Sequence, residues 1–233
     1  MKRLVILTGA GMSSESGIKT FRDTGGLWEE YDVTEVATPM AWWKNRDLVL
    51  QFYNERRKQL AGCKPNPGHI GLAELEKHFD VRIITQNVDN LHERAGSTSV
   101  LHLHGELTKA RSTSDLSLIY DIGYKDINPG DNCEKGSQLR PHIVWFGEAV
   151  PMMDEAVKIT AEADIFVVVG SSLNVYPAAG LIGYAPANAS LWLIDPNDVY
   201  IPVNRKVEVI KENASKGIAI LTQRLFSIYD TKK

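Results

Sequence analysis

The sequence predicts an α/β fold, a doubly wound parallel sheet with a small inserted lobe. Short apolar runs bounded by turn residues recur along the 233-residue chain, and helical patterns separate them. Strands that alternate with helices are typical of a doubly wound sheet. A Gly-Ala-Gly turn at 9–11 follows the first run, where such folds bring the backbone close to a ligand. The length suits one main domain, since domains commonly hold ~100–200 residues.

Five apolar runs are expected to be buried parallel strands, because apolar residues occupy both faces instead of alternating with polar ones. The runs are 4–7, 81–84, 143–146, 165–169 and 191–194. A helix is expected over 67–79, with Asn66 as its N-cap and Pro67 at its first helical position. Its apolar residues can share one face: Ile70, Leu72, Ala73, Leu75 and Phe79.

Two stretches break the alternation and are expected to form the inserted lobe. Residues 30–62 have a helical pattern, whereas 107–139 are polar, rich in Asp, Gly, Ser and Asn, and weakly periodic. We therefore expect one unit over 1–233, with its main sheet domain built from 1–29, 63–106 and 140–233.

Composition argues against several classes of function. A net charge of −3 provides no basic excess for binding nucleic acid. No run approaches the ~20 apolar residues of a membrane span, and the apolar start of the chain is predicted to be a strand and not a cleaved leader. Cys63 and Cys133 lie far apart in sequence, and an intracellular enzyme normally keeps such residues as thiols. We expect a cytoplasmic protein with no nucleic-acid or membrane partner.

Small and polar residues follow several predicted strands, at the edge where open α/β sheets bind ligands. Gly9 and Gly11 follow the first strand, although Ser14 stands where the third glycine of a dinucleotide fingerprint would fall. A plain turn is the alternative there. Other strand ends carry Gln86, Asn87 and Asp89, then Gly170, Ser171 and Ser172, and finally Asp195. Such groups can contact a ribose and phosphates, and loops that satisfy their own backbone are the alternative.

Histidine is the residue type best suited to acid–base chemistry at neutral pH, since its unperturbed pKa is near ~6.5. His102 and His104 lie two residues apart on an extended segment and would share one side of it. Spacing alone does not choose among the six candidates: His69, His78, His92, His102, His104 and His142.

Five ordered motifs closely resemble those of the sirtuin family of NAD-dependent protein lysine deacylases. They are GAGMSSESGIKTFRD from Gly9, TQNVDNLH at 85–92, LHGEL at 103–107, RPHIVWFGE at 140–148 and GSSLNVYPA at 170–178. The resemblance implies a Rossmann-like NAD-binding domain in which NAD is a consumed co-substrate. In the family, the acyl oxygen of a modified lysine attacks NAD and expels nicotinamide. A histidine then activates a ribose hydroxyl, and water releases free lysine and O-acyl-ADP-ribose.

The resemblance also implies residue roles. His104 is the expected catalytic base, Asn87 and Asp89 line the nicotinamide pocket, and Phe21 and Arg22 order a loop that shields the reactive carbon. The family more often carries Asn at the position of Asp195. The expected NAD contacts are Gly9, Ala10, Gly11, Ser13, Phe21, Arg22, Trp28, Gln86, Asn87, Val88, Asp89, Gly170, Ser171, Ser172, Asp195, Pro196, Asn197 and Ala214.

An acylated peptide is expected to pair with one stretch of backbone as an added strand, as in the family. A buried core strand is the alternative for this stretch, and both can hold because alternate residues point opposite ways. The residues concerned are Val144, Trp145, Phe146 and Gly147.

The acyl group is expected to meet Tyr53 and Arg56. Their spacing of three puts both on one face of the expected helix, so that they can converge on one carboxylate. They match the Tyr-x-x-Arg pair of the bacterial class III desuccinylase subgroup, which implies removal of succinyl, malonyl and acetyl groups. A solvated basic face over 56–58, with Tyr53 packed beside Phe52, is the alternative.

The chain departs from the family in lacking two Cys-x-x-Cys pairs between the catalytic histidine and RPHIVWFGE. Ser112 and Asp115 occupy the approximate places of the first pair, and only Cys133 stands near the second. A tetrahedral zinc site needs about four N, S or O ligands. We therefore expect no structural zinc, and interpret 107–139 as a degenerate zinc module.

Two rival functions are a protein ADP-ribosyltransferase and a non-catalytic NAD-sensing module. The presence of His104, Asn87 and Asp89 together disfavours the pure binder.

Overall fold

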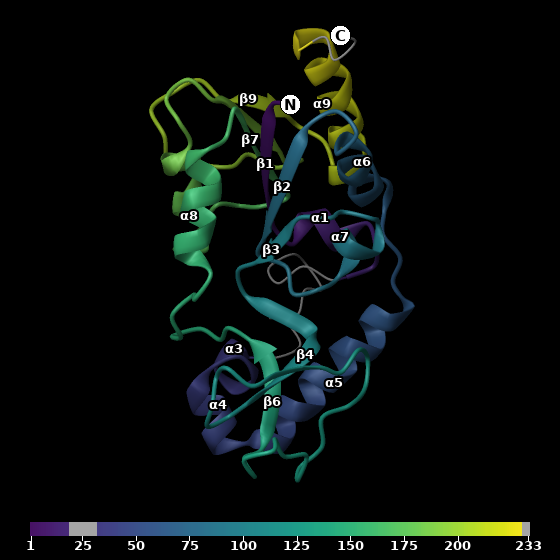
Figure 1. The fold of residues 1–233 in the computed structure, drawn as a ribbon, viewed down its shortest axis with the longest axis vertical. Helices are drawn as coiled ribbons and strands as arrows, with labels where there is room; N and C mark the ends of the chain where they lie inside the picture. The colour runs from purple at the N-terminus through teal and green to yellow at the C-terminus, as the bar shows by residue number, and fades with distance from the viewer. Residues whose placement is uncertain (19–31, 230–233) are drawn as a thin grey trace.

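A parallel sheet confirms the predicted α/β fold. The computed structural model describes residues 1–18 and 32–229 (Figure 1). Among these, six strands run parallel in the order β3-β2-β1-β7-β8-β9. The edge strands β3 and β9 have three residues each, too few for a periodic pattern to predict. The bounds are Arg3–Thr8 (β1), Asp80–Thr85 (β2), Val100–His102 (β3), Ile165–Val169 (β7), Ser190–Ile194 (β8) and Glu208–Ile210 (β9).

Helices cover both faces of this sheet, which explains the uninterrupted apolar runs. Leu4 and Ile6 of β1 belong to a core with α6 and α9, whereas Val5 and Leu7 belong to a second core with α8 and the 3₁₀ helix η1. All four side chains are fully buried. Figure 1 shows α8 across the sheet from α6 and α9. The bounds are Pro67–Leu75 (α6), Met153–Ala161 (α8), Ala178–Tyr184 (η1) and Ala214–Tyr229 (α9).

Helix α6 begins as predicted and ends early. The Asn66 side chain accepts a hydrogen bond from the His69 amide, and the His69 ring accepts one from the Asn66 amide, so the cap is reciprocal. The helix ends at Leu75 because 76–79 turn towards β2. Ile70 is 48% exposed, so the expectation that it shares the buried face is wrong.

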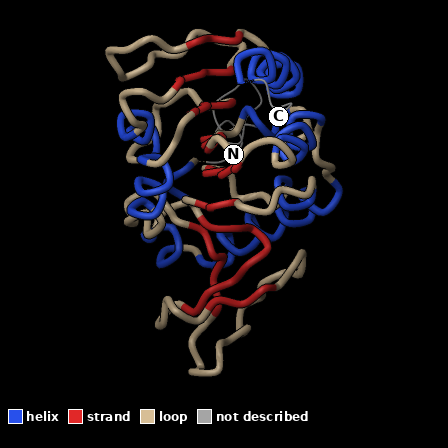
Figure 2. Tube along the Cα trace, turned by 45° about the horizontal axis from the view of Figure 1, so that its top comes forward, coloured by secondary structure: helices blue, strands red, loops and turns tan. Residues whose placement is uncertain are grey.

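A small lobe is built from three helices and an antiparallel sheet ordered β5-β4-β6. Figure 2 shows its strands extending away from the large sheet. No helix among the described residues is both long and apolar enough to cross a bilayer. The bounds are Val33–Val36 (α3), Pro39–Lys44 (α4), Arg46–Gly62 (α5), Gly105–Ser112 (β4), Ile119–Asp121 (β5) and Leu139–Ile143 (β6).

The run 143–146 is not the parallel strand that the sequence predicts. Strand β6 ends at Ile143 and pairs antiparallel with β4. The next three amides donate to separate elements, namely the carbonyls of His104 and Ala37 and the carboxylate of Glu148. An apolar run indicates that residues are buried, but it does not show which group accepts from each amide. The sequence therefore could not distinguish this irregular segment from a strand.

Arg57 is fully buried, which excludes the solvated basic face considered for α5. Its guanidinium donates to the Lys125 carbonyl at 3.0 Å, to the Leu107 carbonyl at 3.4 Å and to the Asn54 side chain. Burial lowers the pKa of Arg57 to about 10. The residue joins α5 to β4 and to the segment before β6.

Candidate active site

The register of the large sheet brings four strand ends together. Thr8 of β1 lies opposite Thr85 of β2 and Val169 of β7, and Val169 lies opposite Ile194 of β8. Their carboxyl ends therefore form one edge, where ligands of open α/β folds bind. The loops that leave this edge are 9–11, 86–89, 170–172 and 195–197.

A cleft of about 510 Å³ lies between this edge and the small lobe. At the sheet edge it brings together most of the predicted NAD contacts, and towards the small lobe it adds the predicted peptide and acyl contacts. The predicted residues that line it are Gly9, Ala10, Gly11, Gln86, Asn87, Val88, His104, Gly170, Ser171, Ser172, Asp195, Pro196, Asn197 and Ala214, with Tyr53, Arg56, Val144, Trp145, Phe146 and Gly147.

A smaller pocket takes in two further predicted residues, Ser13 and Asp89. It shares Ala10, Arg56 and Asn87 with the cleft, so the two spaces are neighbours. The remaining predicted contacts lie outside the described residues: Phe21, Arg22 and Trp28.

Glycines let the loops after β1 and β7 touch. The Gly11 amide donates to the Gly170 carbonyl at 2.9 Å, and the Gly9 amide donates to the Val169 carbonyl at 3.0 Å. A Cβ at Gly170 would lie 2.4 Å from the Met12 nitrogen, and the φ of Gly170 is +60°. A larger residue would force the loops apart. The short helix α1 (Gly11–Ser14) starts at this contact.

A buried hydrogen-bond chain fixes the loop after β2. Asn87 donates from its side-chain nitrogen to the Gly9 carbonyl at 2.9 Å and to the Ser13 hydroxyl at 3.1 Å. The Ser13 hydroxyl donates to Asp89 at 2.9 Å, and Asp89 also accepts from the Leu91 amide at 3.1 Å. Burial raises the pKa of Asp89. The chain ties the Asn87 amide to the first strand's loop.

His104 is held in one tautomer. Its Nδ1 lies 3.0 Å from the Gln86 carbonyl oxygen, which can only accept, so Nδ1 carries the proton. Burial lowers the pKa of His104, and the bond to Gln86 opposes that shift only in part. The ring is therefore neutral at pH 7, with Nε2 as its basic nitrogen.

The pKa of His102 is shifted in the opposite direction. Its Nε2 lies 2.8 Å from the Glu93 carboxylate and its Nδ1 lies 3.2 Å from the Asn87 carbonyl oxygen, so both nitrogens face acceptors. Burial alone would lower the pKa of His102, but the bond and charge of Glu93 outweigh it and the pKa is raised. Glu93 belongs to α7 (Leu91–Arg94), and sequence reasoning missed it because Glu93 and His102 meet only in the fold.

The other histidines are placed away from the cleft. His69 and His92 pack ring to ring at 4.8 Å in the interior, and burial lowers the pKa of both. His78 is exposed on the segment after α6. Burial lowers the pKa of His142 to about 4. Within the described residues, His104 is thus the one histidine that lines the cleft.

Tyr53 and Arg56 project from α5 into the cleft, as their spacing predicts for one helical face. Tyr53 is only 3% exposed, and burial raises its pKa to about 12. Its hydroxyl oxygen accepts a hydrogen bond from the Trp145 indole nitrogen at 3.1 Å. Burial lowers the pKa of Arg56, whose guanidinium also lies 5.5 Å from the centre of the Phe52 ring.

The loop after β8 carries a buried carboxylate. Asp195 is 7% exposed, and one of its oxygens accepts from the Asn197 amide at 2.9 Å. Between the neighbouring loops, the Gln86 side chain donates to the Ser171 hydroxyl at 3.0 Å. Because the Asn197 amide binds only Oδ1 of Asp195, the Oδ2 atom can accept from another donor.

The predicted zinc-module segment offers donors that do not fit a zinc site. The Cys133 thiol donates to the Ser112 hydroxyl at 3.4 Å, Ser112 lies 3.3 Å from the Ser114 hydroxyl, and Ser114 lies 2.6 Å from the Ser137 hydroxyl. No group of three or more His, Cys, Asp or Glu side chains suited to a metal occurs in the described ranges. One thiol among neutral hydroxyls falls short of the four ligands that structural zinc takes.

An open parallel sheet with small and polar residues converging at its carboxyl edge defines a nucleotide-binding α/β protein. Comparisons with known proteins identify the family. The Sir2 family model matches residues 9–177. An NAD-dependent protein deacylase of Bacteroides thetaiotaomicron is 56% identical over 233 residues, covering 97% of this chain and 98% of that protein. Another, of Helicobacter pylori, is 52% identical over 228 residues, covering 98% of this chain and 97% of that protein.

Solved structures agree with these relatives. A mutant Sir2 homologue in complex with ADP-ribose has a TM-score of 0.90 at 37% identity, covering 100% of this chain and 95% of that one. A Sir2 homologue in complex with NAD has a TM-score of 0.87 at 38% identity, covering 97% of this chain and 90% of that one. The chain therefore belongs to the Sir2 family and, like its relatives, is an NAD-dependent protein deacylase. The predicted family and the predicted dependence on NAD are confirmed.

Proposed function

We propose that this deacylase removes succinyl and malonyl groups, as well as acetyl groups, from lysine side chains of proteins, giving nicotinamide and O-acyl-ADP-ribose. The observation that carries the proposal is that Tyr53 and Arg56 line the same cleft as His104. A phenol hydroxyl and a guanidinium are both donors to a carboxylate. Succinyl and malonyl groups end in a carboxylate, and an acetyl group does not.

The charges of the pair suit this preference. The pKa of Tyr53, raised to about 12 by burial, keeps its hydroxyl protonated, and a guanidinium stays charged even where burial lowers its pKa. A charge-assisted bond from Arg56 to the acyl carboxylate contributes roughly 1.5–3 kcal/mol, or about ten- to hundredfold in discrimination. An acetyl group gains nothing from the pair but still fits, so deacetylation is a second activity.

His104 is the catalytic base of this proposal. Because Nδ1 carries a proton and donates it in a hydrogen bond to the Gln86 carbonyl, Nε2 is the nitrogen that can take a proton from a ribose hydroxyl of NAD. The lowered pKa keeps this nitrogen unprotonated at neutral pH. Gln86 thus sets both the orientation and the tautomer of the base.

The Asn87 loop would hold the nicotinamide end of NAD. Asn87 has given its side-chain N–H groups to Gly9 and Ser13, so the group it can offer a ligand is its amide oxygen, an acceptor for a carboxamide N–H. Asp89 fixes this orientation through Ser13. The loops that contain Ser171, Ser172, Asp195, Pro196 and Asn197 would take the adenosine end.

The acylated peptide would lie along Val144, Trp145, Phe146 and Gly147. The amides of the first three already donate within the chain. We therefore infer that strand addition here uses carbonyl oxygens and the Gly147 amide. Because these bonds join main-chain groups, they should depend little on the peptide's sequence.

Arg56→Met tests the acyl preference. The variant should raise KM for a succinyl-lysine peptide about ten- to hundredfold while sparing an acetyl-lysine peptide. Lys58→Met is the matched control, since Lys58 lies on the same helix, is exposed and pairs with Asp126. Equal losses on both peptides, or no loss on either, would show that Arg56 does not contact the acyl carboxylate.

Mass spectrometry of the same reactions tests the reaction type. Free lysine peptide together with O-acyl-ADP-ribose supports deacylation. A peptide that gains the mass of ADP-ribose would favour the transferase, and NAD binding without turnover would favour a sensing module.

A further inference from the structure

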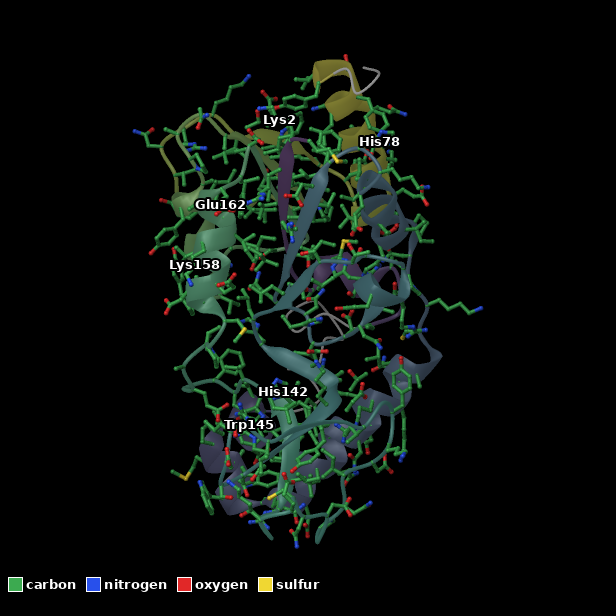
Figure 3. All side chains as sticks on the ribbon, viewed as in Figure 1. Lys2, His78, His142, Trp145, Lys158 and Glu162 are labelled. Carbon is green, nitrogen blue, oxygen red and sulfur yellow. The ribbon has the colours of Figure 1, made fainter. Side chains whose placement is uncertain are left out.

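We propose that Trp145 is a positioning residue for acyl recognition, because its indole N–H makes the Tyr53 hydroxyl a donor towards the acyl carboxylate. The inference rests on the proposed desuccinylase function. Trp145 is 2% exposed and lies in the small lobe near His142 (Figure 3). Its indole nitrogen donates to the Tyr53 hydroxyl oxygen at 3.1 Å, and through this bond the side chain acts on Tyr53.

The polarity of this hydrogen bond follows from the donors available. An indole nitrogen can only donate, so in the 3.1 Å contact the Tyr53 oxygen accepts. No acceptor among the described residues receives the Tyr53 hydroxyl hydrogen. That hydrogen is available to a ligand in the cleft that Tyr53 and Trp145 both line. Without the indole, the Tyr53 hydroxyl could turn its hydrogen away from the cleft. Its oxygen lone pairs would then face the acyl carboxylate and repel it.

A buried charged cluster holds the indole in place. The Arg140 guanidinium lies 3.3 Å from the centre of the Trp145 ring and donates to the Glu148 carboxylate at 2.8 and 3.1 Å. Glu148 also accepts from the Trp145 amide at 2.8 Å and from Arg111 at 3.2 Å. The Arg140–Glu148 ion pair thus fixes both the ring and the backbone of Trp145. In this orientation the indole N–H points at the Tyr53 hydroxyl.

The rival explanation is that Trp145 only fills the small-lobe core. Trp42 supplies a matched comparison, because it is 4% exposed and its ring centre lies 5.8 Å from that of Trp145. Trp42 belongs to the same apolar cluster. A packing effect should therefore appear at both tryptophans, whereas an effect through Tyr53 should appear only at Trp145.

The test is a double-mutant cycle on Trp145→Phe and Tyr53→Phe, read as the ratio of kcat/KM for succinyl-lysine over acetyl-lysine peptide. Trp145→Phe keeps an aromatic ring beneath Arg140 and removes the N–H. We expect this ratio to fall about three- to tenfold, the range of one hydrogen bond. In the Tyr53→Phe background the same change should have no further effect on the ratio. Trp42→Phe should leave the ratio unchanged.

Each outcome decides between the explanations. Proportional losses on both peptides, equal effects in both backgrounds, or a shifted ratio in Trp42→Phe would each overturn the positioning role. A Trp145→Phe protein that melts with the wild type but keeps the wild-type ratio would do the same. If Tyr53→Phe and Arg56→Met also leave the ratio unchanged, the proposed desuccinylase function fails as well, which separates the two failures.

Discussion

Gln86, Asn87 and Asp89 leave the end of one strand of the large sheet, whereas Tyr53 and Trp145 are 92 residues apart and meet only in the folded small lobe. On the nucleotide side, the sheet register fixes where each loop begins, and short polar bonds fix where it goes. On the proposed acyl side, a helix and an irregular segment are held together by buried charges.

Because the two groups of residues are positioned by different parts of the fold, the reaction and the acyl selectivity should respond to different mutations. Groups at the sheet edge are positioned by strands packed between two cores, so chemistry there should be insensitive to changes in the small lobe. The proposed acyl contacts depend on buried ions such as Arg57 and Arg140, and a buried ion that loses its partner is costly. Acyl selectivity should therefore be the easier property to change.

The largest expected effect lies on the nucleotide side, at His104→Ala. Loss of the base should lower kcat for both peptides by ~10²–10⁴. NAD binding should be largely kept, since the base acts on a hydroxyl of NAD that is already bound. Steady-state kinetics and calorimetric NAD titration measure the two properties. His78→Ala, at an exposed histidine, is the control, and wild-type turnover of the His104 variant would disprove the assignment.

A smaller effect, on stability, is expected on the acyl side at Arg57→Met. The change removes the guanidinium that donates to the half-buried Lys125 carbonyl and the buried Leu107 carbonyl, at a cost of about 2–4 kcal/mol in the free energy of unfolding. Urea denaturation should show this loss. Lys58→Met, which breaks an exposed ion pair, should cost less than about 1 kcal/mol. Equal stabilities of the two variants would show that Arg57 does not hold α5 in the lobe.

The sequence predicts the nucleotide side better than the acyl side for a physical reason. Apolar runs mark buried strands, and the residues after them fall at the sheet edge in any doubly wound fold, so the loops after β1, β2, β7 and β8 could be placed in advance. The run 143–146 misled because burial alone does not give strand direction. Strands β3, β5 and β9 are too short to carry a pattern.

Long-range polar partners were beyond the sequence. Glu148 was part of a quoted motif, but nothing local shows that its carboxylate would accept from Arg111, Arg140 and the Trp145 amide at once. Likewise, Arg57 is buried whereas Lys58 and Gln59 beside it on α5 are exposed, only because the chain folds over Arg57. Such partners depend on tertiary contacts, which residue spacing along one helix does not encode.

The pH dependence of catalysis should sharpen the comparison, because the proposed base lies at the sheet edge and titrates separately from the proposed acyl contacts. Burial lowers the pKa of His104, so the base is lost only as the pH falls through a value below its ordinary ~6.5, and kcat/KM should be level from there to neutral pH. The acid limb should be the same for succinyl and acetyl peptides, because Tyr53, with a pKa of about 12, does not titrate in this range. Limbs that differ between the two peptides, or that lie above pH 7, would contradict this assignment.

The smallest expected effect is that of a chelator, which we predict to change neither melting temperature nor turnover. The end of β4 and the turn that contains Cys133 are joined by hydrogen bonds through Ser112, Ser114 and Ser137, and an ion pair of 2.6 Å between Lys135 and Asp115 adds to them. Neutral hydroxyls are poor zinc ligands, and one thiol cannot complete a tetrahedral site. Cys133→Ser should therefore cost no more than about 1 kcal/mol, as expected for one hydrogen bond. Elemental analysis that finds one zinc per chain after extensive dialysis, lost in Cys133→Ser, would show that metal and not hydrogen bonding closes this end of the lobe.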